Sequence, residues 1–546
     1  MIKSAHLLPL TGLRFFAAAA IVLLHSAETW PIPSALGNLA LNQGVSFFFV
    51  LSGFILAYVY RDIRSFADAR EFYVARVARI WPVHIAATLL LFVLLPQYLA
   101  GLRVQDGAQI TVAYVTLTQA WFPFWNYFLA FNGVSWTIST ELFFYLTFPL
   151  FIRSWGQWNA AKIPLAALPA LLVIVYVNVA QVPATEWTPG LTVHGLIYIF
   201  PPSRLVEFVC GVVVAQIWLQ RGEAREWSRI KSAALEIAAI CFVYIAMRYC
   251  RPAADTELAQ LIGGTGGAHW LRVNGFTPAF VLMVYVFASS RGPIAAFLGS
   301  RLMFRLGEIS FSLYMVHTVV LTLFNAYPRT IAAHLPFNSQ LAYWLICLAC
   351  AYCMWRYVET PMRRAIINFY RREPTNFSAS VRDLIRRAGH LVAPLLVVFM
   401  ASTILFPRPE IDLVTGEPST LTFKPREPVV FGGQYEFLGI HASEYGQNTN
   451  FEIYLRAVRP VRLDKTLAVH TFDAAGNILG SGDVLIDRAR SDVSAGTTWR
   501  VHSTVPTSWL ASPRALGIAI YDRDGTMPLS KGTGDWEGRR YRLVMP

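Results

Sequence analysis

Apolar runs of about 20 residues recur through the first 407 residues of this 546-residue chain, and each is long enough to cross a bilayer as one helix. The composition agrees, because 55% of the residues are hydrophobic and only 14% are charged. Soluble domains are about 25% charged. We therefore predict an integral membrane protein and exclude both intrinsic disorder and a single soluble domain.

Eleven apolar segments are predicted to span the membrane, about ten as a core and one after it. They are residues 10–29, 41–60, 80–99, 134–153, 163–181, 204–220, 232–249, 274–290, 308–327, 339–358 and 389–407. With a cytoplasmic N-terminus, the cytoplasmic loops carry 21 Lys and Arg and the opposite loops 4. That bias is typical of membrane proteins. A full crossing by the apolar segment 111–131 would reverse it, so we interpret that segment as re-entrant or interfacial.

The composition of the chain changes after residue 407, where a C-terminal tail begins. This tail carries 16 basic and 16 acidic residues, and several of its segments alternate apolar and polar side chains, as half-buried strands do. The predicted fold is an all-α polytopic membrane bundle followed by a small extracytoplasmic all-β domain, a sandwich of about seven strands. The predicted parts are a transmembrane domain (1–361), a basic cytoplasmic linker (362–388), the additional helix (389–407) and the β-domain (408–546).

The whole net charge of +13 lies in the first 407 residues, within short loops between apolar runs. We interpret it as a topology signal rather than as a nucleic-acid surface. Cys347, Cys350 and Cys353 have a spacing like that of metal ligands. Because they fall in an apolar helix, we expect buried thiols and no metal site.

Arg14 and His25 lie eleven residues apart in the first span. At 100° per residue they share one helix face, separated by roughly 16 Å along the axis. Charged and titratable side chains inside a bilayer are costly, so such a pair usually faces a cavity and marks a functional pathway. The structural alternative is that Arg14 extends to the interface and His25 hydrogen-bonds a neighbouring helix.

Glu141 lies in the fourth span, at a depth that we expect to match His25. A carboxylate there needs a partner, and a carboxylate can hold an imidazole in one tautomer. We therefore predict that Glu141 orients His25; the structural alternative is a glutamate bonded to Ser or Tyr groups. Arg76 and Arg79 stand just before the third span, where an arginine pair is suited either to phosphate or to the topology signal alone.

Six motifs occur in the order typical of one family. They are LTGLRFFAAAAIVLLHS, GVSFFFVLSGFIL, ARVARIWPVH, VSWTISTELFFYLTFPLF, ISFSLYMVH and VETPMRR. Residues 6–366 therefore resemble the acyltransferase-3 family of polytopic membrane acyltransferases, which includes O-antigen and other polysaccharide O-acetyltransferases. The tail lacks the Gly-Asp-Ser nucleophile block and paired Asp-x-x-His that some members carry in a fused domain. We therefore expect it to bind or position a glycan without catalysis.

The resemblance implies acetyl-CoA or another acyl-CoA as the cytoplasmic donor substrate, with no bound cofactor. The acceptor would be a hydroxyl of a glycan or lipid-linked saccharide, such as lipopolysaccharide O-antigen, at a bacterial inner membrane with a periplasmic tail. His25 and Glu141 are the implied catalytic residues. The implied substrate-binding residues are Arg14, Arg76, Arg79, Ser52, Trp136, Tyr314 and His317. Gly53 would let two helices approach closely.

The preferred mechanism has His25, oriented by Glu141, remove the proton of the acceptor hydroxyl, which attacks the thioester directly. An acyl-imidazole on His25 is the alternative route. Two non-enzymatic functions use similar residues: a proton-coupled transporter, against which no inverted repeat is visible, and a non-catalytic partner in glycan export. Membrane lipid is an expected partner, and nucleic acid is not.

Overall fold

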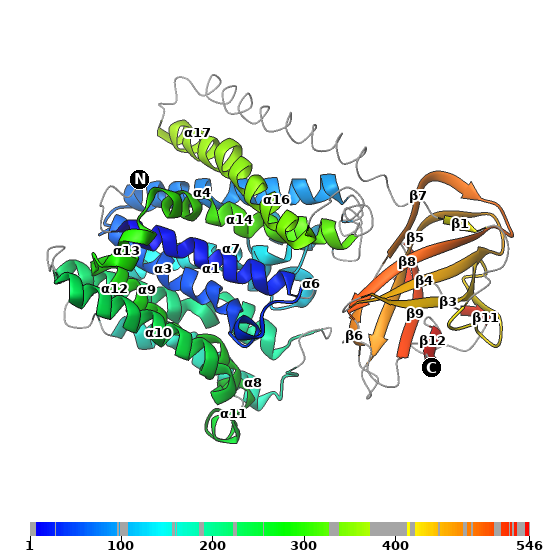
Figure 1. The fold of residues 1–546 in the computed structure, drawn as a ribbon, viewed down its shortest axis with the longest axis horizontal. Helices are drawn as coiled ribbons and strands as arrows, with labels where there is room; N and C mark the ends of the chain where they lie inside the picture. Colours follow the sequence, from blue (N-terminus) through cyan, green and yellow to red (C-terminus); the bar gives the residue numbers. More distant parts are fainter. Residues whose placement is uncertain are drawn as a thin grey trace. The chain divides into compact units, whose positions relative to one another are not determined.

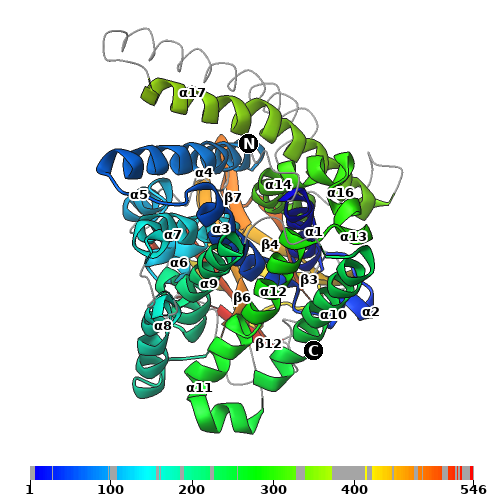
Figure 2. The same cartoon turned by 90° about the vertical axis from the view of Figure 1, so that its left-hand side faces the viewer.

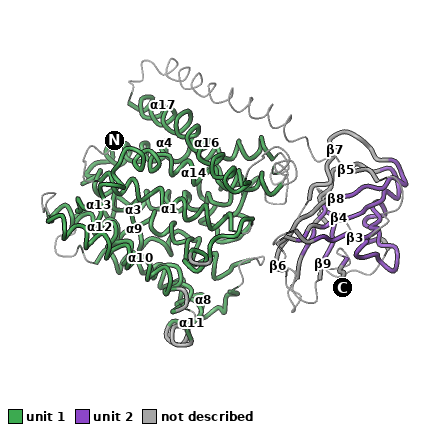
Figure 3. Tube along the Cα trace, viewed as in Figure 1, with its two compact units in different colours: residues 1–102, 106–402 green, residues 103–105, 403–546 purple. Residues whose placement is uncertain are grey.

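The computed structural model describes most of the chain, in two compact units (Figure 3). It describes residues 7–371 except 28, 96–97, 99–106, 155–158, 160, 185–189, 222–226, 255 and 327–337. It also describes residues 412–544 except 415–420, 446–447, 473–477, 482–483, 507–514, 523–524, 527–528 and 532–540. The described residues of the first unit (7–371) are mainly helical, and those of the second unit (412–544) form strands.

The helical unit is a bundle in which long helices lie beside one another (Figures 1 and 2). Its helices are α1 (Leu8–Ser26), α2 (Ser34–Gly37), α3 (Gly44–Val59), α4 (Phe66–Leu94), α5 (Gly107–Val115), α6 (Trp125–Phe128), α7 (Trp136–Ile152), α8 (Lys162–Val179), α9 (Pro201–Gln220), α10 (Arg229–Ala254), α11 (Glu257–Asn274), α12 (Thr277–Ser289), α13 (Pro293–Leu298), α14 (Arg301–Ala326), α16 (Ser339–Cys353) and α17 (Thr360–Arg371). Short 3₁₀ and π segments include η2 (Leu41–Gln43), η4 (Gln119–Trp121), η5 (Gly133–Ser135), η7 (Gly195–Ile199) and η8 (Met354–Glu359).

Nine helical segments of the described residues are long and apolar enough to cross a membrane. They cover nine of the first ten predicted spans. The remaining span, predicted at 134–153, corresponds to the 17-residue α7. Segment 111–131 forms no continuous helix, because α5, η4 and α6 follow one another there as short separate pieces. The predicted helical membrane bundle is therefore confirmed. The predicted span 389–407 lies outside the described residues.

Helix α4 begins well before the predicted third span, at Phe66 instead of residue 80. Its start is fixed by a capping box, in which the Ser65 hydroxyl accepts from the Asp68 N–H and the Asp68 carboxylate accepts from the Ser65 N–H. Arg76 and Arg79 therefore lie inside the helix and not in a preceding loop. Charged residues lower the mean hydropathy of the first part of α4 without ending the helix. The apolar run therefore predicted the start of α4 too late in the sequence.

The predicted linker 362–388 also begins as helix, because α17 continues to Arg371. Helix α17 packs against α4, where Arg371 pairs with Glu71 and the Arg70 guanidinium lies 4.8 Å from the centre of the Tyr370 ring. These contacts keep the basic segment helical at its start. The rest of the linker lies outside the described residues.

Two glycines allow α3 and α9 to pack backbone against backbone. A Cβ on Gly53 of α3 would overlap the carbonyl oxygen of Phe208, and a Cβ on Gly211 of α9 would overlap that of Val50. Small residues at such crossings are typical of helix association in membranes. The expected close approach at Gly53 is confirmed, and it fixes the position of the neighbouring Ser52.

Replacing Gly53 by alanine is expected to lower the thermal stability of the purified protein, because backbone atoms cannot yield as a flexible side chain can. Overpacking of this kind costs about 1–3 kcal/mol. The matched control is Gly267→Ala in α11, where a Cβ meets nothing within 4 Å. Thermal unfolding in detergent measures both variants, and equal midpoints would show that the α3–α9 contact is not tight.

The second unit is a β-sandwich. Its strands are β1 (Asp412–Val414), β2 (Val429–Phe431), β3 (Tyr435–Tyr445), β4 (Asn448–Ala457), β5 (Val461–Phe472), β6 (Ile478–Ser481), β7 (Val484–Val493), β8 (Thr498–Pro506), β9 (Ala515–Asp522), β10 (Gly525–Thr526), β11 (Leu529–Lys531) and β12 (Tyr541–Val544). One sheet has the order β1-β8-β4-β3-β2-β11. The other has the order β10-β9-β5-β6, with β12 also paired to β9 and β7 to β5. All described pairings are antiparallel.

One apolar core lies between the two sheets. Trp499 of β8 is fully buried there against Tyr435 of β3, and Leu467 and Ile518 enter the core from the other sheet. The sandwich is confirmed, but the expectation of about seven strands is wrong, since the described residues form twelve. The alternating segments correspond to β3, β4, β5, β8, β9 and β12. Five of the six strands that were not predicted have at most four residues and are too short to show a pattern of alternation.

Candidate active site

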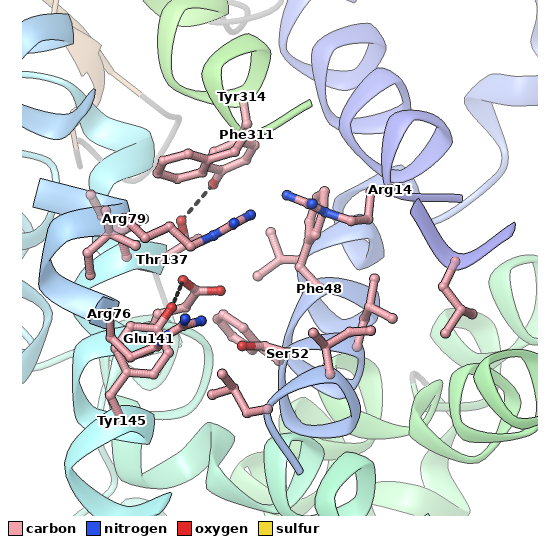
Figure 4. Close-up of a pocket in the computed structure, with 18 of the residues that line it drawn as sticks. Arg14, Phe48, Ser52, Arg76, Arg79, Thr137, Glu141, Tyr145, Phe311 and Tyr314 are labelled. Atoms are coloured by element: carbon pink, nitrogen blue, oxygen red, sulfur yellow. Dashed lines mark hydrogen bonds between the residues drawn. The ribbon is translucent and has the colours of Figure 1, made fainter. Parts of the chain in front are cut away.

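Five helices enclose a cavity of about 160 Å³ in the helical unit, lined by three arginines (Figure 4). Its lining comes from α1 (Leu10, Thr11, Arg14), α3 (Val45, Phe48, Phe49, Leu51, Ser52, Ile55, Leu56), α4 (Arg76, Arg79, Ile80), α7 (Thr137, Ile138, Glu141, Tyr145) and α14 (Phe311, Tyr314). We call it the arginine cavity. The guanidinium groups of Arg14 and Arg79 point toward one another across it.

Much of the hydrogen-bonding capacity of these arginines is unused by the described residues. Arg76 donates to the Tyr60 hydroxyl at 3.1 Å, while its buried Nε meets no acceptor there. No hydrogen-bond partner of the Arg14 or Arg79 guanidinium is found in the same part of the chain. Guanidinium groups with free N–H donors suit an anion with several oxygens, such as a phosphate.

One carboxylate, Glu141, faces the three arginines. It accepts a 2.8 Å hydrogen bond from the hydroxyl of Tyr145, one helical turn further along α7. The formal charge of the lining is therefore +2. The surrounding walls are mostly apolar, so this charge attracts an anionic ligand more strongly than it would in water.

A second cavity, of about 210 Å³, contains His25. It is lined by Ile21, Leu24, His25, Asn42, Val45, Leu129, Gly133, Val134, Trp136, Tyr198, Tyr314 and Thr318. We call it the histidine cavity. Val45 and Tyr314 line both cavities, so the two spaces adjoin at these side chains. Thr137 fixes Tyr314 there by donating to its hydroxyl at 3.1 Å.

The partner of His25 is His317. The His25 Nδ1 and His317 Nε2 atoms are 2.8 Å apart, and the two ring planes differ by 2°. The ring centres are 5.1 Å apart, which exceeds the N–N distance by about two ring radii. The imidazoles therefore meet edge to edge. His317 is fully buried and His25 lines the cavity.

A buried ion pair supports the aromatic wall of the histidine cavity. Arg204 donates to Glu207 at 2.7 Å, and neither side chain has exposed area. Arg204 also donates to the Tyr198 carbonyl at 2.8 Å, with its guanidinium 6.0 Å from the centre of the Trp136 ring. Complete pairing of this kind makes Arg204 a structural group.

The structure brings most of the predicted site residues together. The arginine cavity holds Arg14, Ser52, Arg76, Arg79, Glu141 and Tyr314, and the histidine cavity holds His25, Trp136 and again Tyr314. His317 lines neither cavity in the described structure and lies behind His25. Its expected place among the substrate contacts stays a prediction. The described residues also contain no group of three His, Cys, Asp or Glu that could hold a metal ion.

The expected pairing of Glu141 with His25 is not found among the described residues, where Glu141 bonds Tyr145 and His25 bonds His317. Helix α7 starts close to its predicted position, and its first residue, Trp136, lines the histidine cavity together with His25. Glu141 lies about 8 Å further along the helix, in the arginine cavity, which is deeper than we expected from the sequence.

The match to a known family decides the class of this site. The acyltransferase domain model matches residues 9–356, which include every residue placed in the two cavities. The chain belongs to the acyltransferase domain family. This confirms the resemblance that the six motifs indicated, and both cavities lie within the acyltransferase domain of a multi-pass membrane protein.

Relatives of known name agree with the family. The chain is 32% identical to acyltransferase MdmB of Streptomyces mycarofaciens over 57% of its own length and 78% of that protein. It is 24% identical to O-acetyltransferase OatA of Staphylococcus aureus over 67% of its own length and 58% of that protein. Nodulation protein 10 of Rhizobium leguminosarum bv. viciae is 25% identical, over 57% and 81% respectively. No solved structure matches the chain.

Several residues of this acyltransferase domain were not anticipated. Tyr145 and Thr137 each lie four residues from Glu141 on α7, a spacing that could have indicated both. Asn42 and Thr318 add polar groups to the histidine cavity, and no motif singles them out. Their roles follow only from the way the helices pack.

Proposed function

We propose that the protein transfers an acyl group, acetyl in the simplest case, from cytoplasmic acyl-CoA to a hydroxyl of a glycan or lipid-linked saccharide on the other side of the membrane. The observation that carries the proposal is the junction of the two cavities at Val45 and Tyr314. One cavity suits the phosphates of a donor, and the other contains a histidine base. The name of the relative OatA, an O-acetyltransferase, supports the acetyl group and the oxygen acceptor.

The donor is proposed to bind in the arginine cavity. CoA carries several phosphates, and Arg76, Arg79 and Arg14 supply the donors that these oxygens need. The pantetheine arm, about 15–20 Å when extended like a few residues of chain, then reaches from the level of Arg14 to that of His25. Glu141 limits the positive charge of the cavity and holds Tyr145 beside the arginines.

The acceptor is proposed to enter the histidine cavity, where Trp136, Tyr198 and Tyr314 present aromatic rings. His25 removes the hydroxyl proton while the hydroxyl oxygen bonds to the thioester carbonyl carbon. The carbon–sulfur bond then breaks, and the protonated His25 returns the proton to the leaving thiolate. The products are an O-acyl glycan and free CoA, so the atoms and charges balance without a cofactor.

The test is acyl transfer by the purified full chain in proteoliposomes. Labelled acetyl-CoA is added on the side of the arginine cavity, with and without a surface-glycan extract on the other side. We expect acceptor-dependent label in the glycan and matching release of CoA. Transport of a solute driven by a proton gradient, with the acetyl-CoA left intact in the presence of the extract, would contradict the proposal.

A further inference from the structure

The contacts of His317 determine where its proton lies. Its Nδ1 is 2.6 Å from the backbone carbonyl oxygen of Tyr314, one helical turn earlier in α14. A carbonyl oxygen only accepts hydrogen bonds, so Nδ1 of His317 carries a hydrogen and donates it. Because His317 has no exposed area, a neutral ring is favoured over a charged one. The Nε2 atom of His317 is then a lone-pair acceptor.

The lone pair on His317 in turn determines where the proton of His25 lies. A lone pair at His317 Nε2 needs a donor, and the atom 2.8 Å away is His25 Nδ1. His25 therefore carries its hydrogen on Nδ1 and donates it to His317. In a neutral imidazole only one nitrogen bears hydrogen, so the Nε2 of His25 is left with its lone pair. His25 is the member of the pair that lines the histidine cavity.

We propose that His317 is a positioning residue that fixes the tautomer of His25 and leaves Nε2 of His25 as the atom that takes the acceptor proton. The proposal rests on the function proposed above, and it replaces Glu141 in the orienting role. His317 itself touches no substrate, because it lies behind His25 and lines neither cavity among the described residues.

The surroundings of His317 hold its ring in place. The Tyr343 hydroxyl of α16 donates to the His317 carbonyl at 3.4 Å. The Asn132 amide donates to the Met315 carbonyl at 2.9 Å and accepts from the Thr318 hydroxyl at 2.7 Å. These contacts fix α14 on both sides of His317. A fixed acceptor restricts rotation of the His25 ring, which keeps the same nitrogen facing the cavity.

A neutral partner changes the chemistry relative to a carboxylate. When His25 accepts the acceptor proton at Nε2, both of its nitrogens carry hydrogen and its Nδ1–H bond to His317 becomes charge-assisted. Because His317 is neutral, it stabilises the imidazolium of His25 less than a carboxylate partner would. The proton is therefore readily returned to the thiolate leaving group, which completes the transfer.

Two substitutions separate positioning from packing. His317→Gln keeps an acceptor oxygen for His25 and an N–H donor for the Tyr314 carbonyl, while His317→Leu keeps the volume and removes both. We expect His317→Leu to lower kcat by about 10²-fold or more, within the range of general-base help, with the KM of the acyl-CoA donor unchanged. His317→Gln is expected to recover most of that loss.

The tautomer is read directly, in the absence of turnover, by ¹⁵N NMR of histidine-labelled full-length protein in nanodiscs. The signals of His25 are assigned by their loss in His25→Ala. Wild type is expected to show hydrogen on Nδ1 and none on Nε2, and His317→Leu a mixture of tautomers. Tyr343→Phe is the matched control, since it removes one contact to the His317 backbone while the Asn132 contacts still hold α14 and the ring pair is unchanged.

Hydrogen on Nε2 of His25 in the wild type would overturn the proposal, and so would full kcat in His317→Leu. Failure of the proposed function has a different signature. In that case His25→Ala retains acyl transfer while the NMR tautomer of the wild type is still as stated. The two ideas therefore fail in distinguishable ways.

Discussion

Replacing His25 by alanine is expected to lower kcat for acyl transfer by about 10²–10⁴-fold, the range that a positioned general base contributes. The residual rate comes from bringing donor and acceptor together in the adjoining cavities, which the substitution leaves in place. Because His25 does not line the arginine cavity, the dissociation constant of acyl-CoA is expected to stay unchanged. Initial rates in proteoliposomes and equilibrium donor binding measure the two quantities separately.

The matched control for this substitution is His84→Ala. His84 is a fully buried histidine of α4 whose Nε2–H donates to the Tyr114 carbonyl at 3.0 Å, and it lines neither cavity in the described structure. Its loss is expected to lower thermal stability while kcat per folded molecule is retained. Equal effects of the two substitutions on kcat would assign His25 a structural role.

Wild-type protein and His25→Ala together also distinguish the acyl-imidazole route from direct transfer. If His25 attacks the thioester itself, donor mixed with wild-type protein in the absence of acceptor leaves the acyl group on the peptide that contains His25. Direct transfer leaves none. Rapid quenching and mass spectrometry of the peptide detect the adduct, and His25→Ala provides the blank.

The membrane bundle was predictable because a lipid environment allows few alternatives. Backbone polar groups in the hydrocarbon core must be paired within a helix, so each apolar run of sufficient length is a helix. The ends of these helices were less predictable. Helix α4 starts at a capping box formed by Ser65 and Asp68, fourteen residues before its apolar run. Local hydrogen bonds, and not hydropathy, determine such ends.

The members of the site were more predictable than their pairing. The motifs indicated His25, Glu141 and His317, but not which of them meet. His25 and His317 are 292 residues apart in the chain, and their contact depends on how α1 packs against α14. Glu141 was placed too near His25 because its depth relative to His25 depends on how α7 sits beside the other helices of the bundle. Neither arrangement is encoded in a local pattern of residues.

Replacing Arg76 and Arg79 together by glutamine is expected to weaken binding of acyl-CoA strongly. A hydrogen bond to a charged group contributes about 1.5–3 kcal/mol, and each 1.4 kcal/mol is tenfold in affinity, so each arginine is expected to account for about 10-fold to 100-fold. The two effects need not add, because both side chains line one cavity. Since KM equals the dissociation constant only when chemistry is slow, equilibrium binding of a non-transferable acyl-CoA analogue is the measurement.

The matched control is Arg70→Gln, which removes the same charge from an exposed position of the same helix, outside the cavity. It is expected to leave donor affinity within about twofold, because exposed charges are screened by salt. A second donor makes the test specific for phosphate. An acyl thioester of N-acetylcysteamine has the reactive group of the donor and no phosphates, so it is expected to react slowly and equally with wild type and with the double variant.

Three outcomes separate the possible roles of the arginine pair. Loss of affinity for acyl-CoA, with unchanged reaction of the phosphate-free thioester, assigns Arg76 and Arg79 to the phosphates. Equal losses with both donors would mean that the substitutions distort the cavity, for example by releasing the Arg76 contact with Tyr60. Unchanged affinity for acyl-CoA would leave these arginines as part of the charge bias that orients the chain, and the donor would have to enter elsewhere.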